Sequence, residues 1–320
     1  MRRVRCGLAG LVSAIVTSIR VAVGPKQAEF ARDAVRAGGG EPVGVEDKAD
    51  GLIWLAVRDN DGLRAALAST GARWVQLSSA GIEQTVASGL IDDTRTWTST
   101  KGSYAEPVAE HALMLALAGL RVLPRRIAAR SWGKPAADTL FDAPVTILGG
   151  GGITASLLQL LAPFRVSATV LRRAAEPVAG AARTLPMSEL NTALAESKVV
   201  FLALALTPQT EHVIGAEQLA AMRPDSWLVN VARGRHIDTA ALVEALTSGA
   251  IGGAGLDVTE PEPLPDGHPL WDLENCIITP HTADTLEMIR PLLARRITRN
   301  VARFAAGEPL EGLVDPAAGY

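Results

Sequence analysis

Apolar runs that fit β-strands alternate with stretches that fit helices over the first hundred residues. We predict strands at residues 19–24, 50–57 and 74–77, with helices at 26–37 and 61–69 between them. The first helix ends at three consecutive glycines, which are strong stop signals. Alternation at this spacing predicts a parallel sheet with helices on both faces.

A second block with the same alternation follows a long apolar helix predicted at 106–130. Pro107 sits at its start, where a missing N–H costs little, and Pro124 is expected to kink or divide it. Further strands are predicted at 145–148, 168–171, 199–204, 227–231, 253–256 and 276–279, with helices at 239–247 and 288–306. The chain therefore reads as an α/β protein with two Rossmann-like, doubly wound parallel-sheet domains.

Composition narrows the possible partners. The 320 residues are 48% hydrophobic and carry a formal net charge of −3, so there is no basic excess of the kind that nucleic-acid binding needs. Cys6 and Cys276 lie far apart, and neither they nor any pair of histidines has metal-ligand spacing, so we expect no metal and no disulfide.

The N-terminal residues resemble the start of a signal peptide. Residues 1–5 are basic and residues 6–16 are apolar and small, but no clean small-x-small cleavage site precedes the first strand. We interpret residues 1–18 as an extension, produced by an upstream start codon. No run reaches the roughly 18 uninterrupted apolar residues of a membrane span, so we expect a cytoplasmic protein without a membrane partner.

Four glycines follow the strand at 145–148 and precede a helical pattern. A glycine-rich turn between a strand and a helix lets a pyrophosphate approach the backbone amides at the helix N-terminus. In the favoured register Gly149 and Gly151 are the first two fingerprint glycines and Thr154 stands in the third place. A shifted register would use Gly150, Gly152 and Ala155. Either register predicts dinucleotide binding.

The residues after the next strand bear on the choice between NAD and NADP. An acidic residue there would accept a hydrogen bond from the ribose 2′-OH of NAD. The strand instead ends in Arg172 and Arg173, whose guanidinium groups suit a 2′-phosphate. The alternative is that both arginines form a solvated surface pair. The sequence favours NADP over NAD as the cofactor.

At this point a family resemblance becomes visible. From about residue 19 the chain resembles the D-isomer-specific 2-hydroxyacid dehydrogenases over nearly its whole length. The matching segments are LSSAGIE (77–83), VAEHALMLAL (108–117), the glycine turn, LTPQTEHVIG (206–215), LVNVARGRHID (228–238), GLDVTEPEPLP (255–265), HPLW (268–271) and ITPHTA (278–283). The resemblance implies two domains, a flavodoxin-like substrate domain at 1–103 plus 284–320 and a dinucleotide-binding domain at 104–283.

The resemblance also implies three catalytic residues. Arg233 corresponds to the arginine that binds the substrate carboxylate and carbonyl, for which a guanidinium fork is suited. His281 corresponds to the acid/base, because an imidazole titrating near neutrality can exchange a proton with the substrate oxygen. Glu262 corresponds to its carboxylate partner. Glu260 is the competing candidate, but Pro-Leu-Pro directly follows Glu262 as in the family.

Other matched positions imply ligand contacts. The cofactor-lining set comprises Gly149, Gly151, Gly152, Ile153, Arg172, Arg173, Thr207, Val231, Ala232, Arg233, Asp257, His281 and Ala283. Asp257 matches the residue near the nicotinamide. The substrate-binding set comprises Ser79, Ala80, Gly81, Lys101, Gly102, Arg233 and His281. Backbone amides in these loops can hold an anion, and a solvated position is the simpler interpretation of Lys101.

Some residues depart from the family pattern or have a simpler interpretation. Asp284 follows TPHTA where a small residue is more usual, and it lies close enough in sequence to raise the pKa of His281. His111 is interpreted as a packed or interface residue. The remaining histidines, at 212, 236 and 268, are interpreted as loop or helix-edge residues.

The sequence therefore predicts hydride transfer between NAD(P)(H) and C2 of a small 2-hydroxy or 2-keto acid. On resemblance alone, hydroxypyruvate and glyoxylate are the first substrates expected. A phosphoglycerate dehydrogenase and a dinucleotide-sensing corepressor-like protein are the alternatives. The resemblance also implies a homodimer formed through the cofactor domain, with the apolar helix beginning near Val108 as the contact.

Overall fold

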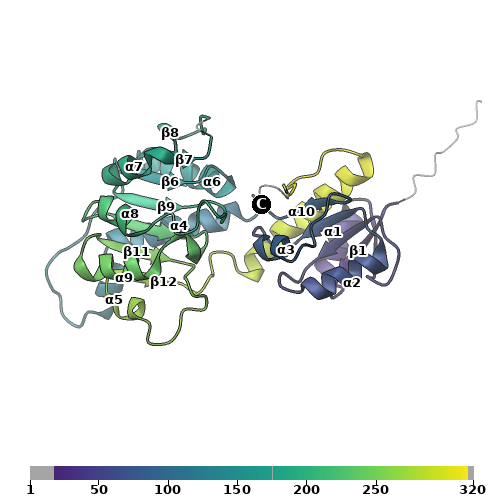
Figure 1. Cartoon of the computed structure of the whole chain (residues 1–320), viewed down its shortest axis with the longest axis horizontal. Coiled ribbons are helices and arrows are strands. Elements are labelled where there is room, and N and C mark those ends of the chain that lie inside the picture. Colours follow the sequence, from purple (N-terminus) through teal and green to yellow (C-terminus); the bar gives the residue numbers. More distant parts are fainter. Residues whose placement is uncertain (1–17, 175, 316–320) are drawn as a thin grey trace, which may run out of the picture.

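The computed structural model describes residues 18–174 and 176–315, so residues 1–17 of the predicted extension lie outside the described part. The chain forms two lobes, each built on its own parallel sheet. Figure 1 shows the strands of residues 144–278 in one lobe, and the elements of residues 20–98 with the last helix, residues 286–306, in the other. The α/β fold with two doubly wound parallel sheets is confirmed.

The first lobe holds a five-stranded sheet in the order β2-β1-β3-β4-β5. Its strands are β1 (Arg20–Gly24), β2 (Glu41–Val43), β3 (Gly51–Trp54), β4 (Trp74–Leu77) and β5 (Thr96–Thr98). All four neighbouring pairs are parallel, and the order is that of flavodoxin-like sheets.

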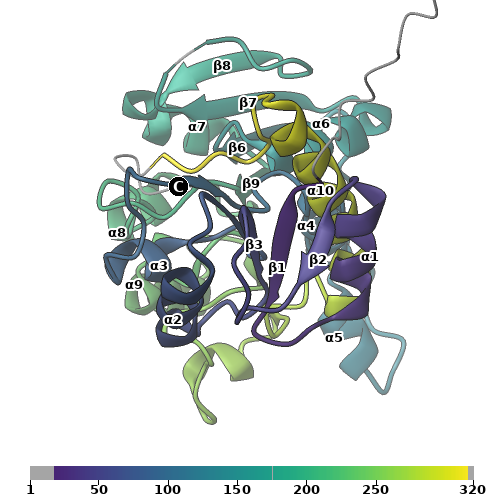
Figure 2. The same cartoon turned by 90° about the vertical axis from the view of Figure 1, so that its right-hand side faces the viewer.

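Helices cover both faces of this sheet. Helix α2 (Asn60–Thr70) packs its apolar side onto one face, and α1 (Glu29–Ala37) packs onto the other. Helix α10 (Leu286–Ala306), from the far end of the chain, lies beside α1 and completes that second core; Figure 2 shows the two helices together. The short helix α3 (Glu83–Ala87) follows β4.

The second lobe holds a seven-stranded parallel sheet in the order β12-β11-β10-β9-β6-β7-β8. Its strands are β6 (Pro144–Leu148), β7 (Ser167–Arg172), β8 (Arg183–Pro186), β9 (Val199–Leu202), β10 (Trp227–Asn230), β11 (Gly253–Leu256) and β12 (Cys276–Ile278). The order of the strands reverses between β6 and β9. Ligands of open α/β sheets bind at the carboxyl ends of strands beside such a reversal.

Six helices accompany the seven-stranded sheet. Helix α4 (Ala105–Leu120) and α6 (Gly152–Leu161) pack on one face, and α7 (Leu190–Glu196), α8 (Ala216–Ala221) and α9 (Thr239–Ser248) pack on the other. The sixth, α5 (Leu123–Ala128), continues α4. Short 3₁₀ turns occur at Ala162–Phe164, Met187–Glu189, Gly234–His236 and Pro269–Asp272.

The long helix predicted at 106–130 is divided, but not at the proline. The chain leaves the helical path at Val122, which has a positive φ of 46°, and Pro124 falls in the first turn of α5. A proline is tolerated there because that N–H has no helical acceptor. Val108 is buried in the core of its own lobe, whereas Met114 of the same helix is 42% exposed, and a dimer contact through this helix stays a prediction.

Three strands were not foreseen from the sequence: β2, β5 and β8. Each lies at an edge of its sheet and is only three or four residues long. An edge strand buries fewer side chains, so it lacks the apolar run that marked the central strands. In β8, for example, none of the four residues is fully buried. None of the helices within residues 18–174 and 176–315 is long and apolar enough to cross a membrane.

Packing of α4 on the second sheet gives a direct test of this core. Leu115 has no solvent exposure, and its Cβ lies 3.0 Å from where a Cβ on Gly255 would stand. We predict that Leu115→Ala lowers the free energy of unfolding by about 2–5 kcal/mol, because it leaves a cavity. Urea unfolding of the full chain measures this change in the free energy of unfolding. Met114→Ala, at a neighbouring side chain that is 42% exposed, is the control and should change the free energy little; equal losses would contradict the packing described.

Candidate active site

The turn between β6 and α6 has the geometry of a dinucleotide-binding loop. Gly149 has φ +106°, and a Cβ there would lie 2.3 Å from the carbonyl oxygen of Ala203, so only glycine fits. Gly151 is the N-cap of α6, and no atom lies within 4 Å of where its Cβ would be. Thr154 is fully buried and its hydroxyl donates to the carbonyl of Gly149 at 2.8 Å. This geometry favours the register in which Gly149 and Gly151 are the first two fingerprint glycines. Thr154 stands in the place of the third, and its hydroxyl closes the turn by binding the carbonyl of Gly149.

Gly152 brings the two lobes into contact. A Cβ on Gly152 would lie 3.0 Å from the Cα of Gly102 and 3.3 Å from the Cβ of Ala105. Gly102 itself has φ +78°. The predicted substrate loop at 101–102 therefore lies directly against the N-terminus of α6, with room for no side chain between them.

Arg172 lies over the glycine turn, at the end of β7. Its side chain comes within 3.1 Å of the Cβ position of Gly150, and it forms an ion pair with Glu176 at 3.1 Å. Arg173 is exposed. Arg172 is thus the arginine of the pair that lies beside the turn.

Arg233 projects from the end of β10 against the substrate lobe. Its Nη2 would lie only 1.6 Å from a Cβ on Gly81, so a side chain at position 81 would displace the guanidinium from this place. Its Nε forms an ion pair with Glu83 at 3.2 Å, and its Nη1 donates to the carbonyl of Ala232 at 2.7 Å. The Nη2 edge beside Gly81 is therefore the part of the guanidinium best placed for a substrate carboxylate.

The backbone around Arg233 is held by buried polar groups. The Asn230 side chain donates to the carbonyl of Arg233 at 2.8 Å and accepts from the amide of Ala232 at 3.0 Å. Nδ1 of the fully buried His236 lies 3.2 Å from the amide nitrogen of Arg233, which donates to it. Burial lowers the pKa of His236, which favours the neutral ring that can accept this bond.

The structure brings His281 and Glu262 together. Nδ1 of His281 lies 2.8 Å from Oε1 of Glu262, which leaves Nε2 on the far side of the ring. Glu260, the competing candidate, instead lies 2.8 Å from Nε2 of His212 and near Arg235. His281 has φ +52°, and its amide donates to the carbonyl of Asp257 at 2.8 Å.

Asp257 organises the backbone that carries His281. Its buried carboxylate accepts hydrogen bonds from the Thr279 hydroxyl at 2.6 Å and from the amides of Thr282 at 2.9 Å and Ala283 at 3.1 Å. His111 of α4 lies 3.3 Å away and also contacts Thr279. Burial raises the pKa of Asp257, but these hydrogen bonds, that of His111 foremost, outweigh burial and hold the pKa below its usual value.

Asp284 lies among the charged groups of the site. It is half-buried, and burial raises the pKa of its carboxyl. His281 and Arg233 both attract its negative charge, whereas Asp257 repels it.

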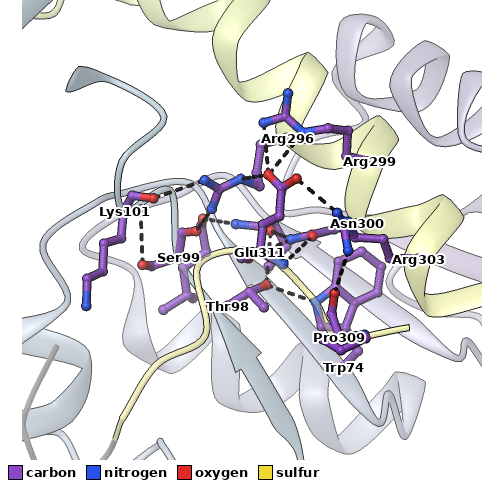
Figure 3. Close-up of polar contacts among 12 residues, drawn as sticks. Trp74, Thr98, Ser99, Lys101, Arg296, Arg299, Asn300, Arg303, Pro309 and Glu311 are labelled. Carbon is purple, nitrogen blue, oxygen red and sulfur yellow. Dashed lines mark hydrogen bonds and ion pairs between the residues drawn. The ribbon is translucent and has the colours of Figure 1, made fainter. Parts of the chain in front are cut away.

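Arg296 of α10 holds the substrate loop from behind. Figure 3 shows this buried side chain reaching from the helix to the loop: Nη1 donates to the carbonyl of Ser99 at 2.7 Å and Nη2 to that of Lys101 at 3.0 Å. Glu311 lies 3.3 Å from its Nε. Burial lowers the pKa of Arg296. The loop from Ser99 to Gly102 is therefore fixed by a helix almost two hundred residues further along the chain.

The second substrate loop is fixed in a similar way. The hydroxyl of Tyr104 donates to the carbonyl of Ser78 at 2.8 Å, and the amide of Thr100 donates to the carbonyl of Ser79 at 3.0 Å. Ala80 and Gly81 follow directly, beside Arg233. The loops at 78–81 and 99–102 thus support each other at the face of the substrate lobe that meets Arg233.

The other predicted cofactor residues lie at the carboxyl ends of the strands around the switch point. Val231 and Ala232 follow β10 and are buried, Thr207 lies in the turn after β9, and Ala283 is buried beside Asp257. Ile153 packs its side chain onto the core from the first turn of α6. Five supporting residues were not assigned roles from the sequence: Glu83, Tyr104, His111, Asn230 and Arg296. Glu83, His111 and Asn230 did fall within motifs that carried the family resemblance.

Within the described part of the chain, no group of three or more histidine, cysteine, aspartate or glutamate side chains is arranged to hold a metal ion. Cys276 is a free thiol, and burial raises its pKa to about 12.

Comparison with known proteins gives this geometry a family. The model of the D-isomer specific 2-hydroxyacid dehydrogenase NAD-binding domain matches residues 111–283. The chain belongs to the D-isomer specific 2-hydroxyacid dehydrogenase family. This dehydrogenase is an NAD(P)-dependent oxidoreductase that acts on 2-hydroxy or 2-keto acids, so the predicted family, activity and cofactor class are confirmed.

Similar proteins span most of the chain. An uncharacterised protein encoded in the proB 3′ region of Corynebacterium melassecola is 43% identical over 78% of this chain and 84% of its own length. Glyoxylate/hydroxypyruvate reductase B of Pectobacterium carotovorum is 38% identical over 66% of this chain and 69% of its own. A D-isomer specific 2-hydroxyacid dehydrogenase from Xanthobacter autotrophicus, solved with NADPH and MES, is 28% identical with a TM-score of 0.83, covering 95% of this chain and all of that one.

The two aspartates of the site should affect stability in opposite directions as pH changes. A carboxyl with a raised pKa binds its proton more tightly in the folded state, so the fold loses stability as pH rises from the ordinary pKa through the raised one. We therefore predict that Asp284→Asn melts at the same temperature as wild type near pH 4 and at a higher temperature than wild type at neutral pH.

Asp257 supplies the matched comparison. Its lowered pKa stabilises the fold above the ordinary aspartate pKa, and this contribution is lost as pH falls through the lowered pKa. Asp257→Asn should therefore melt below wild type at neutral pH, with the deficit shrinking on acidification. Thermal melts from about pH 2.5 to about pH 8, a range that extends below the ordinary aspartate pKa, measure both differences. A difference in melting temperature between variant and wild type that stays the same at every pH would contradict the assigned directions of the two pKa shifts.

Proposed function

We propose that this dehydrogenase reduces small 2-keto acids, with hydroxypyruvate and glyoxylate first among them. The observation that carries the proposal is the convergence of two pairs of residues: Arg233 with Gly81, and His281 with Glu262. The amide of Asp257 donates to the carbonyl of Asn230 at 2.9 Å, and the amide of His281 donates to the carbonyl of Asp257 at 2.8 Å, so the two pairs follow neighbouring strand ends. The reductases named among its relatives support the same substrates.

Arg233 binds the substrate. Its Nη2 edge faces the loop of Ser79, Ala80 and Gly81, so a carboxylate placed there meets the guanidinium from one lobe and backbone amides from the other. The same charge polarises the adjacent keto group and stabilises negative charge that develops on its oxygen. The ion pair between Glu83 and Nε of Arg233 orients the guanidinium, so that its Nη2 edge lies toward the substrate.

His281 supplies the proton. Glu262 accepts the hydrogen bond from Nδ1–H, which orients the ring, so Nε2–H of the imidazolium can protonate the keto oxygen. In the reverse direction the neutral ring accepts the proton of the 2-hydroxyl. The bound nicotinamide supplies or receives the hydride at C2.

The residues present fit a dinucleotide. The turn at Gly149 and the open space beside Gly151 suit a pyrophosphate at the N-terminus of α6. At the neighbouring strand ends lie Thr207, Val231, Ala232, Asp257 and Ala283. Arg172 beside the turn, with Arg173 next to it, favours NADP over NAD. The Glu176 carboxylate that now pairs with Arg172 would be displaced by a 2′-phosphate.

We further propose that residues 1–103 with 284–320 move as the substrate domain against residues 104–283. Closure would bring the loop of Lys101 and Gly102 onto the cofactor and expel water from around the reacting carbon. The contact of Gly102 with Gly152 lies where the chain crosses between the two parts.

The protein is also proposed to act as a cytoplasmic homodimer, without nucleic-acid or membrane partners. The exposed apolar side chains that support a dimer lie on and after α5 of the cofactor lobe, where Ile127 is 70% and Trp132 is 96% exposed. Burial of such side chains against a second copy would remove them from water.

Steady-state kinetics with NADPH and with NADH on a panel of 2-keto acids tests the proposed reaction. We expect turnover of hydroxypyruvate and glyoxylate, and a loss of at least about 100-fold in kcat for Glu262→Gln or His281→Ala, because general acid catalysis is removed. Glu260→Gln removes the other histidine-paired carboxylate and is the matched control; it should leave kcat within a few-fold of wild type. Cofactor binding without turnover of any keto acid would instead favour the dinucleotide-sensing alternative.

The cofactor preference has a separate test. Arg172→Ala should raise KM for NADPH by about 10- to 100-fold relative to KM for NADH, because one charge-assisted hydrogen bond to the 2′-phosphate is lost. Arg165→Ala, at an exposed arginine of the same lobe paired with Asp142, controls for net charge. An equal change for both cofactors would argue against a 2′-phosphate site at Arg172.

A further inference from the structure

A small pocket in the substrate lobe lies beside the loop that meets Arg233. It encloses about 210 Å³ of free space, its mouth included, and its narrow interior holds about one water-sized group. It is lined by Trp54, Ala56, Val57, Asn60, Leu63, Leu77, Ser78, Ser79 and Thr85. These residues gather at the carboxyl ends of β3 and β4, the edge of a parallel sheet where ligands bind.

The pocket is within reach of a substrate held by Arg233. Ser79 lines the pocket, and Gly81, two residues further on, lies against Nη2 of Arg233. Two residues span at most about 7 Å. A three-carbon acid whose carboxylate lies on Arg233 can therefore direct its third carbon toward the pocket.

Two lining residues carry buried polar atoms without a hydrogen-bond partner. Trp54 is 3% exposed and Ser78 is 9% exposed, and neither the indole Nε1 nor the serine Oγ has a partner. Buried polar groups are nearly always paired, because an unpaired one has lost its water. Two such atoms on residues that line one small pocket indicate that a ligand, or a water that the ligand displaces, supplies their missing hydrogen-bond partners.

The surroundings of both residues are ordered. The Cε3–Cζ3 edge of the Trp54 ring lies against Gly24 of β1, which leaves the Nε1 edge on the other side of the ring. The carbonyl of Ser78 accepts from the Tyr104 hydroxyl at 2.8 Å and from that of Thr100 at 3.3 Å, so the backbone that carries the serine hydroxyl is fixed.

The chemistry of the lining selects one kind of substituent. An indole N–H only donates, and a serine hydroxyl donates or accepts, so together they suit an alcohol oxygen. None of the nine lining residues carries a charge, so a phosphate or carboxylate would lose its water without compensation. A methyl group would fit but would leave both polar atoms unpaired.

We propose that this pocket is the subsite for a neutral hydroxyl group on C3 of the substrate, with Trp54 and Ser78 as its specificity-determining residues. The inference rests on the proposed function, and it assigns the preferred substrates to 3-hydroxy-2-keto acids. Among three-carbon keto acids, those without this hydroxyl and those with a 3-phosphate are the disfavoured classes.

The test compares hydroxypyruvate with pyruvate, which differ by that one hydroxyl, and includes 3-phosphohydroxypyruvate. In wild type, kcat/KM for hydroxypyruvate should exceed both others by at least about 10-fold. Because hydroxypyruvate and pyruvate also differ in intrinsic reactivity, the informative quantity is how a variant changes their ratio. Trp54→Phe and Ser78→Ala should each lower the hydroxypyruvate-to-pyruvate ratio by about 5- to 10-fold.

Trp97→Phe is the matched control. Trp97 is also 3% exposed with an unpartnered Nε1 and belongs to the same core cluster, but it does not line the pocket. Its substitution should leave the ratio unchanged. Because the ratio is measured on one sample of each variant, a partial loss of folded enzyme cancels, and Ser78→Ala provides a second, smaller change should the indole variant fold poorly.

The outcomes separate the two proposals. If wild type reduces no 2-keto acid, the proposed function is wrong, and the subsite proposal is wrong as well because it depends on that function. If wild type reduces pyruvate and hydroxypyruvate but neither pocket variant changes their ratio, or Trp97→Phe changes it equally, the subsite is wrong and the proposed function stands. Preference for 3-phosphohydroxypyruvate would also overturn the subsite.

Discussion

The approach of Arg233 to the backbone of Gly81 is the constraint on which the rest of the site depends. The guanidinium follows β10 and the turn follows β4, so they belong to different sheets, yet a Cβ on Gly81 would displace the guanidinium. Glu83, Asn230 and His236 fix the arginine on its other sides. Because each lobe supplies half of the carboxylate site, the relative position of the lobes determines whether an acid can bind at all.

Much of the fold could be predicted from the sequence, because central parallel strands bury both faces and appear as continuous apolar runs. The glycine turn, Arg233 and His281 could be found because they follow such strands and match family motifs. The unforeseen edge strand β8 shows the limit, since an exposed strand leaves no apolar run. Whether Glu262 or Glu260 reaches His281 depended on backbone geometry; proximity to Pro-Leu-Pro favoured Glu262, and the structure places it there.

The supporting residues were harder to find, because their partners are remote in sequence. His111 reads as a packed helical histidine, yet it lies against Thr279 and Asp257 from the other end of the cofactor lobe. Arg296 reads as one of several arginines on the last helix, yet it is buried and bonded to two carbonyls of the substrate loop. A sequence pattern predicts which face of a helix is buried, but it does not identify the polar group that this face binds in another part of the chain.

The return of α10 to the first lobe has a consequence for how the protein is made. The face of the first sheet that carries α1 is finished by Leu293, Ile297 and Val301, and Arg296 ties Ser99 in place across 197 residues of chain. The lobe that leaves the ribosome first is therefore the last to be completed. Its uncovered apolar face must persist while the entire second lobe is synthesised, which is the interval in which a nascent chain is most exposed to aggregation.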